Sequence, residues 1–303
     1  MIEQATVQAV KATVKPKYSH FLGCVMPAKM PWAESAIMKT LPWLGVDIEY
    51  LTKSTCCPRA GVWISVDKRV WLTLASYNLL QAEQAGRDVM VSCNGCYVTL
   101  YEANRVLQED PKALAEVNQY LAAAGKHYNA SVRVRHLLEV LYEDVGIERI
   151  KKEARKLHIR TAIHPGCHMR IFPDGHLVRY FEELNKALVD EVVPYGLEQM
   201  CCGLQANLAD REFATQDRAK RKFDAIKAQN VDALVLVCSG CYDQFERAIA
   251  TLRKKGYDFD VPVIHLAELL AVSFGLKPDD FGMRYMRTAP VDKLIEKLEN
   301  RGK

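Results

Sequence analysis

The sequence predicts an α/β protein of two duplicated domains with parallel strands, each domain carrying a five-cysteine motif. Two observations support this. The ten cysteines of the 303-residue chain form two sets of five that repeat along the sequence. Around each set, apolar runs and helix-like stretches alternate in the order typical of βαβ units. A chain of this length can form two domains of roughly 150 residues, each with its own core. We place them at residues 1–150 and 151–303.

The repeat is defined by the cysteines. The N-terminal cysteine set consists of Cys24, Cys56, Cys57, Cys93 and Cys96, and the C-terminal cysteine set of Cys167, Cys201, Cys202, Cys238 and Cys241. In each set a lone cysteine precedes a Cys-Cys pair by 31 or 33 residues, and a C-x-x-C motif follows the pair after 35 residues. From the pair onward the sets superimpose at an offset of 145 residues, which also aligns Tyr97 with Tyr242. This agreement indicates internal duplication of a thiolate site.

In the first half, strands are predicted where short apolar runs lead toward cysteines, at residues 18–25, 46–51 and 88–93. A helix is predicted over 65–85, because apolar residues recur there at spacings of three and four, with Ser65 as its cap and Gly86 after its end. A second helix begins near Tyr97. Strand, helix and strand in succession favour parallel pairing.

The second half repeats this order, with strands predicted at 159–167 and 233–238 and helices at 210–228 and 242–252. The two halves also close alike, since residues 132–139 (VRVRHLLE) match residues 261–268 (VPVIHLAE). The first half is longer by about 16 residues between its C-x-x-C motif and this match, and we place the insertion in the polar stretch 108–130. The basic stretch 147–158 is the predicted domain boundary, and a short amphipathic segment is expected near 291–298.

Composition excludes several classes of protein. The chain is 49% hydrophobic and 26% charged with a net charge of +4, which is ordinary for a globular protein and too mild to indicate nucleic-acid binding. Residues 1–20 lack the apolar core of a signal peptide, and no stretch approaches the ~20 apolar residues of a membrane helix. We therefore expect a cytoplasmic protein with no membrane span, whose thiols stay reduced and serve metal binding or catalysis.

The cysteine pattern favours iron–sulfur chemistry. Each C-x-x-C motif lies where a strand ends and a helix begins, so backbone N–H groups and the helix dipole stabilise thiolates there. Structural zinc uses four ligands and would leave a fifth cysteine unused in both sets, and a disulfide framework conflicts with the expected compartment. Conventional iron–sulfur clusters also use four ligands. The fifth thiolate therefore either bridges irons in a non-standard cluster or is spare for covalent sulfur chemistry.

The spacing resembles the cysteine motif of the CCG-domain family. From YSHFLGCVMP through HPGCH to HLAELLAVSFG, residues 18 to about 280 resemble the B subunit of heterodisulfide reductase, including the related B subunits of sulfur-oxidising bacteria. The resemblance implies that each cysteine set holds one non-cubane [4Fe-4S] cluster. It also implies that the two clusters face each other and that a disulfide is cleaved between them.

Two departures from the family pattern bear on the substrate. Pro58, not glycine, follows the first Cys-Cys pair, and residues 204–207 (LQAN) stand where the methanogen enzymes are expected to have a glycine-rich run. If that loop lines the cavity, its side chains replace open space. A disulfide, a persulfide or a lipoate-type dithiol are then all candidate substrates, and the reaction could run in the oxidative direction.

Cys167 and His168 are the candidate catalytic residues. Reductive cleavage of a disulfide needs protons for the departing thiolates, and histidine titrates in the useful range. His168 is thus expected to donate or accept a proton, the alternative being a hydrogen bond to a cluster sulfur or a carbonyl. His164 lies on the other side of Cys167.

Other residues near the cysteines receive structural interpretations. His136 and His265 are expected to cap helices, and Tyr97 and Tyr242 to shield the clusters from water. The basic residues Lys29, Arg59 and Arg170 either attract an acidic substrate tail or are simply solvated. Residues 218–222 (RAKRK) are expected to form an exposed helix face.

The electrons must come from other polypeptides, since the chain contains neither a G-x-G-x-x-G motif nor a compact C-x-x-C-x-x-C ferredoxin cassette. The expected partners are a ferredoxin-like iron–sulfur subunit and a flavin-containing subunit. A rival interpretation is an electron-transfer subunit of a glycolate-, lactate- or succinate-type oxidoreductase that does not contact substrate. A zinc-stabilised interaction module is a third.

Overall fold

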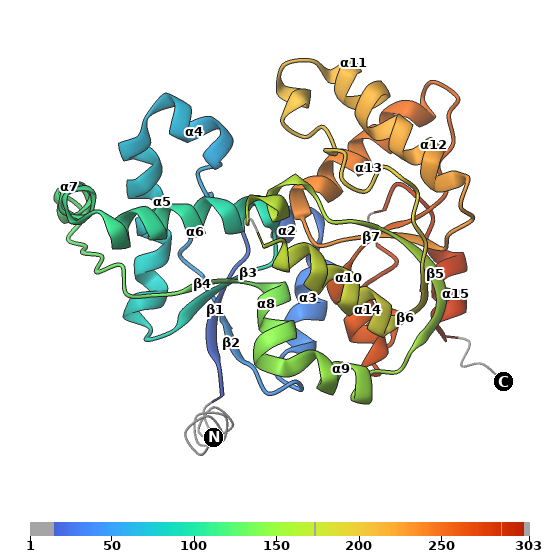
Figure 1. The fold of residues 1–303 in the computed structure, drawn as a ribbon, viewed down its shortest axis with the longest axis horizontal. Coiled ribbons are helices and arrows are strands. Elements are labelled where there is room, and N and C mark those ends of the chain that lie inside the picture. Colours follow the sequence, from blue (N-terminus) through green and yellow to red (C-terminus); the bar gives the residue numbers. More distant parts are fainter. Residues whose placement is uncertain (1–14, 173, 286, 300–303) are drawn as a thin grey trace.

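The computed structural model describes residues 15–172, 174–285 and 287–299, and the polar N-terminal lead up to residue 14 lies outside these ranges. Within them, eight strands form two four-stranded sheets, and every strand pair is parallel. The predicted fold class is confirmed. In Figure 1 the half containing β1 to β4 and the half containing β5 to β8 lie side by side.

The first sheet has the order β2-β1-β3-β4. Its strands are β1 (Lys17–Phe21), β2 (Asp47–Tyr50), β3 (Asp88–Val91) and β4 (Val134–His136). Its helices are α2 (Val25–Lys29), α3 (Pro31–Thr40), α4 (Ala60–Val66), α5 (Lys68–Gln84), α6 (Asn94–Glu109), α7 (Pro111–Ala122), α8 (Leu137–Glu139), the π-helix η1 (Val140–Gly146) and α9 (Ile147–Glu153).

The second sheet has the equivalent order β6-β5-β7-β8. Its strands are β5 (Leu157–His164), β6 (Val189–Val192), β7 (Ala233–Leu236) and β8 (Val263–His265). Its helices are η2 (Cys167–Ile171), α10 (His176–Leu188), η3 (Ala206–Leu208), α11 (Arg211–Phe213), η4 (Ala214–Lys220), α12 (Arg221–Lys227), α13 (Ser239–Arg253), α14 (Leu266–Ser273), η5 (Pro278–Asp280) and α15 (Asp292–Glu299).

The strand order explains where a site can form. From β1 the chain moves outward to β2 and then returns to the other side of β1 as β3, and β5, β6 and β7 do the same. Loops that leave the carboxyl ends of β1 and β3 therefore diverge, and a crevice opens between them. The lone cysteines follow β1 and β5, and the C-x-x-C motifs follow β3 and β7. Both cysteine sets thus lie at such switch points.

Each half packs one of its helices against the other half, an arrangement called the helix exchange below. The helix after the first strand of one half packs against the helix after the last strand of the other: α3 packs on α14, and α10 packs on α8 and α9. These helices gather between the two sheets in Figure 1. The exchange encloses apolar side chains such as Trp32, Ala36 and Ile37 of α3, which are buried. Their burial against the other half joins the two sheets into one body.

Several predicted elements need correction. The stretch 65–85 is not one helix, because Asp67 is extended and caps α5 by accepting from the backbone N–H groups of Arg69 and Val70. Ser65 belongs to the preceding helix α4 instead. The stretch 210–228 contains a π-helical turn, η4, between α11 and α12. The predicted insertion is confirmed as α7, and α15 covers the expected amphipathic segment. The domain boundary near residue 150 stays a prediction.

Candidate iron–sulfur site

Six loops bring the ten cysteines together. Cys24 and Cys167 lie at the starts of α2 and η2, where Gly23 and Gly166, both with positive φ, allow the turn. The Cys-Cys pairs lie in the irregular loops after β2 and β6. Each C-x-x-C motif begins at the N-cap of a helix, α6 or α13. The structure therefore places every predicted ligand at one edge of the two sheets.

Thiol–thiol interactions order each set in the same way. In the N-terminal cysteine set they run Cys24–Cys56–Cys57–Cys96–Cys93, and in the C-terminal cysteine set Cys167–Cys201–Cys202–Cys241–Cys238. The two chains of thiols meet at their buried ends, where the Sγ atoms of Cys93 and Cys238 are 3.8 Å apart. The ten cysteines are all free thiols.

One cavity of ≈ 80 Å³ is lined by all ten cysteines. Within it, Cys24 and Cys56 are exposed, Cys167 and Cys201 are half-buried, and the other six are buried. Each set therefore runs from an accessible end to a buried end beside the other set. A molecule held between the accessible ends would touch both sets.

The residues fit an iron–sulfur cluster in each set. A Cβ atom on Gly23 would lie 2.9 Å from the Sγ of Cys96, and one on Gly240 would lie 3.7 Å from the Sγ of Cys238. At Gly23 the backbone therefore approaches a thiol more closely than a side chain would allow, whereas a Cβ on Gly240 would make an ordinary contact with Cys238. Five thiols per set, of which most are buried, supply the soft donors that iron–sulfur clusters use.

One or two thiols of each set have a lowered pKa, while the pKa of the other thiols in the set is raised. Hydrogen bonds from Cys56 and Cys96 lower the pKa of Cys57 to about 5, and hydrogen bonds from Cys167 and Cys202 lower the pKa of Cys201 to about 2. Hydrogen bonds from Cys238 and Cys96 hold the pKa of Cys93 well below its ordinary value. Thiolates are the metal-binding form of cysteine. Each set thus contains at least one thiolate that can receive iron.

His136 and His265 cap helices, as predicted. Each accepts the N–H of the residue two positions later on Nδ1, and each forms a capping box with a glutamate three positions later. Their Nε2 atoms donate to the N-terminal C-x-x-C loop, that of His136 to Asn94 Oδ1 at 3.1 Å and that of His265 to the Ser92 carbonyl at 3.2 Å. Both histidines therefore also fix the position of Cys93.

His168 and Arg59 lie at the cavity. Nδ1 of His168 is 3.9 Å from the Sγ of Cys167, and burial lowers the pKa of this histidine. Arg59 Nη1 donates to Gln205 Oε1 at 3.4 Å, so the loops after the two Cys-Cys pairs touch across the cavity. Lys29 instead pairs with Asp243 of the other half, and Arg170 is exposed.

Lys222 differs from expectation, and the structure shows the position of His164, for which the sequence indicates no role. Lys222, expected on an exposed face, is fully buried and donates to the Tyr195 hydroxyl at 3.1 Å and to the Leu197 carbonyl. His164 ends β5, and a ring nitrogen lies within 4.8 Å of the thiols of Cys202 and Cys241. The repeat itself contains the missed signal, because Lys222 aligns with Tyr77 of the predicted apolar helix face at the offset of 145.

Tyr97 and Tyr242 belong to the packing between the halves. Neither lines the cavity. The ring of Tyr97 lies 5.9 Å from that of Phe172, and the ring of Tyr242 lies 6.1 Å from that of Trp32. Each tyrosine thus follows the C-x-x-C motif of one half and contacts an aromatic residue of the other, beneath the thiols.

Comparison with known proteins decides the family. The model of the CCG cysteine-rich domain matches twice, over residues 18–101 and 161–246. The chain belongs to the CCG family. It is 36% identical over 276 residues to the B subunit of the Ferredoxin/F(420)H(2)-dependent CoB-CoM heterodisulfide reductase of Methanosarcina acetivorans, covering 88% of this chain and 92% of that one. It is 33% identical to a protein of Archaeoglobus profundus that is named as similar to the heterodisulfide reductase B subunit, covering 94% and 99%.

More distant proteins extend the comparison. Lactate utilization protein A of a Geobacillus species is 25% identical over 84% of this chain and 98% of its own. A crystal structure of a hypothetical protein from Helicobacter pylori superposes with a TM-score of 0.68 at 16% identity, covering 89% of this chain and about half, 51%, of the other. This last likeness shows the fold alone.

Family and thiol geometry together identify the chain as an iron–sulfur subunit of an oxidoreductase of the heterodisulfide reductase B type. These heterodisulfide reductase relatives are named as subunits of larger enzymes. Among the helices in the described ranges, none is long and apolar enough to cross a membrane.

Proposed function

We propose that this chain cleaves or forms a sulfur–sulfur bond between two non-cubane [4Fe-4S] clusters, one in each cysteine set. The observation that carries the proposal is the single cavity lined by all ten cysteines. A carrier that only passes electrons onward has no need for two sets that open into one cavity. A disulfide held there would have one sulfur near each set.

The reaction balances with two clusters. Cleaving one S–S bond consumes two electrons and two protons and releases two thiols. Two clusters, when bound, supply one electron each and a surface on which substrate sulfur can be held. The chain's own residues do the rest: the cysteines hold the clusters, and the buried Cys93 and Cys238 thiols keep the two sets adjacent.

Cys167 and His168 are proposed to act at the accessible end. Cys167 is half-buried at the cavity and His168 Nδ1 is 3.9 Å from its Sγ. A histidine in this place can pass a proton to a departing thiolate. The set contains five cysteines, whereas a conventional cluster uses four ligands. Cys167 can therefore be the cysteine that contacts substrate sulfur. Replacement of His168 by Gln is expected to slow turnover without loss of iron.

The loop after the second Cys-Cys pair restricts the substrate. Leu204 and Gln205 line the cavity, and the Leu204 side chain covers Gly240, where a Cβ would lie 2.8 Å from its Cδ2 atom. Arg59 and Gln205 bridge the cavity at its edge. These contacts favour a narrow substrate, such as a persulfide or the dithiol of a lipoyl group, over a bulky heterodisulfide, and they allow the oxidative direction as in sulfur oxidation.

A ferredoxin-like subunit and a flavin-containing subunit are the proposed electron partners.

A second candidate function is electron transfer without substrate contact, as in a lactate-, glycolate- or succinate-oxidising complex. The 25% identity to a lactate utilization protein favours it. Iron and sulfide analysis of anaerobically purified protein, followed by EPR with and without a small disulfide, separates the two. About eight irons per chain, four for each [4Fe-4S] cluster, and a new signal on adding disulfide support the proposed function. Full clusters whose EPR signal does not change with any disulfide, persulfide or dithiol support electron transfer. Zinc without iron would contradict both candidate functions.

A further inference from the structure

The two cysteine sets are surrounded by different residues at equivalent positions. The first such position is the last residue of β1 and β5. Phe21 pairs in register with Val91, and His164 pairs in register with Leu236. Val91 and Leu236 are themselves 145 residues apart, so the repeat aligns Phe21 with His164. A hydrocarbon ring therefore stands in one half where an imidazole stands in the other.

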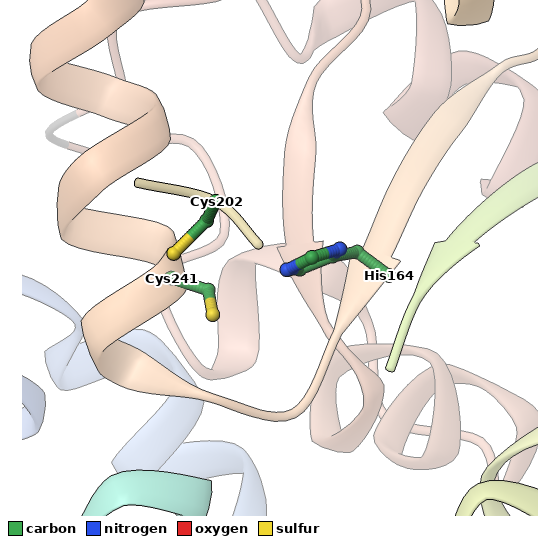
Figure 2. Close-up of side chains that lie close together, drawn as sticks. All are labelled: His164, Cys202 and Cys241. Carbon is green, nitrogen blue, oxygen red and sulfur yellow. The ribbon is translucent and has the colours of Figure 1, made fainter. Parts of the chain in front are cut away.

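The imidazole of His164 is directed at the C-terminal cysteine set. Figure 2 shows the ring pointing from its strand toward the thiols of Cys202 and Cys241, and the three ligand atoms lie within 4.8 Å of one another. The residue is 1% exposed, and neither ring nitrogen makes a hydrogen bond of normal geometry within the described residues. A weaker interaction reaches the backbone of Glu198. A buried imidazole without partners is costly, and a group held by Cys202 and Cys241 would supply the missing partner.

The second position follows the Cys-Cys pairs. The Gly203 N–H donates to the Sγ of Cys201 at 3.4 Å. Pro58 occupies the equivalent position in the first half, and proline has no N–H to donate. The C-terminal cysteine set therefore receives a backbone hydrogen bond that the N-terminal cysteine set cannot receive.

The third position lies on the helices that precede β3 and β7. Lys222 of α12 is fully buried and acts electrostatically on the thiols of Cys202, Cys241 and Cys201. Tyr77 of α5 aligns with it and carries no charge there. A buried cation is poorly screened, so it stabilises added negative charge nearby.

Two features instead stabilise negative charge on the N-terminal cysteine set, and their effect is weaker. The Ser239 hydroxyl lowers the pKa of Cys93, and Arg59 lowers that of Cys56 in the N-terminal cysteine set. Arg59 lies at the partly exposed cavity edge, where solvent and salt screen its charge. The N-terminal cysteine set is thus stabilised by one hydroxyl and one screened cation. The C-terminal cysteine set has one imidazole, one backbone N–H and one buried cation beside it.

Building on the proposed function, we propose that His164 makes a direct nitrogen contact to the C-terminal iron–sulfur cluster, which is therefore reduced before the N-terminal one. A neutral imidazole can donate an N–H to sulfur or offer its lone pair to iron. Both contacts raise the reduction potential of an iron–sulfur centre. The first electron that enters this chain settles on the C-terminal cluster, and the second electron reduces the N-terminal cluster.

The test is an EPR-monitored redox titration of the cluster-loaded protein and of His164→Phe, which copies the residue of the other half. Pairing each with Cys57→Ser, which removes iron from the N-terminal cysteine set, assigns the midpoints. His164→Phe is expected to lower the C-terminal midpoint, so that the ratio of reduced to oxidised cluster at a fixed potential falls about tenfold, or about 59 mV for one electron. The matched control is His158→Phe, an exposed histidine on the same strand, which is expected to change neither midpoint.

Two further measurements keep the inference testable if His164→Phe does not fold. Phe21→His is expected to raise the N-terminal midpoint. In the unaltered protein, labelling histidine with ¹⁵N is expected to change the hyperfine spectrum of the reduced C-terminal cluster. Loaded clusters with equal midpoints, or a spectrum without any nitrogen coupling, would overturn this inference and leave the proposed function intact. Protein without iron would overturn the proposed function itself.

Discussion

The two cysteine sets share a backbone and differ in their surroundings. Strand order, loop geometry, the order of the thiol–thiol interactions and the capping histidines repeat in both halves. The residues one layer behind the thiols do not repeat, since His164, Gly203 and Lys222 replace Phe21, Pro58 and Tyr77. The comparison teaches that the thiols determine which cofactor binds, whereas the side chains behind them determine how each cofactor behaves. The predictions below test the likeness first and the differences afterwards.

The largest effect is expected from the ligands. Cys57→Ser and Cys202→Ser each remove one member of a Cys-Cys pair, and each is expected to lower the iron content from about eight to about four per chain, because in the proposed function each set holds its own [4Fe-4S] cluster. Iron analysis of anaerobic protein checks this. If either substitution alone removed all iron, the sets would assemble as one unit through Cys93 and Cys238, and the comparison of two separate sites would fail.

The capping boxes are expected to differ in stability. Glu268 pairs with Arg287 where both are buried (0% and 2% exposed side chains), and Arg287 also lies 4.8 Å over the Trp32 ring. Arg287→Leu leaves a buried carboxylate without its cation and is expected to cost about 3–5 kcal/mol. The equivalent Glu139 is partly exposed and 3.7 Å from Arg135, so Arg135→Leu should cost less. Urea midpoints of the loaded variants give the order, and equal losses would contradict it.

Gly23 tests the close approach of backbone and thiol. Its φ of +68° resembles that of Gly86 at +65°, so alanine at either position is expected to cost about 1–2 kcal/mol of backbone strain. Only at Gly23 would the new Cβ meet a ligand, the Cys96 Sγ at 2.9 Å, while nothing lies within 4 Å at Gly86. Gly23→Ala should therefore also lower iron occupancy of the N-terminal cysteine set. Gly86→Ala is the control and should keep full iron.

The smallest effect is expected at the exposed contact between the halves. Lys29 of α2 pairs with Asp243 of α13, and the lysine side chain is 43% exposed. Solvent screening limits such a pair to about 0–1 kcal/mol, and Arg247 remains paired with Asp243. Lys29→Met should shift the urea midpoint slightly at low salt and not at all at high salt. A loss comparable to that of Arg287→Leu would show that this contact holds the halves together.

Much of the fold and the convergence of the ten cysteines could be predicted because the cysteines mark the ends of recognisable strands. The strand at 88–93 and the C-x-x-C motif after it are adjacent in sequence, so local pattern suffices. β6 was not predicted, because its sequence VDEV carries two acidic residues and alternates weakly. The start of α5 was misplaced because Ser65 and Asp67 can both cap, and only the structure shows which one accepts hydrogen bonds.

The helix exchange could not be predicted from local pattern, since it depends on contacts between residues far apart in sequence. Lys222 was misjudged for a related reason. A run of basic residues normally indicates an exposed face, but here the run lies on π-helix η4 and α12, whose geometry turns Lys222 inward toward Tyr195 and Leu197. Applying the offset of 145 to every position, not to cysteines alone, would have indicated Lys222, whereas His164 aligns with Phe21 only at the offset of 143 that relates Cys24 to Cys167.

The exchange of α3 and α10 between the halves gives the chain the architecture of a symmetric dimer that has been fused end to end. Two separate identical chains would carry the same side chain at both sites, because one gene would encode both. Within one chain the two copies of each position are free to differ. Covalent linkage thus turns a symmetric pair of sites into a directional one, in which an electron can have a preferred side to enter.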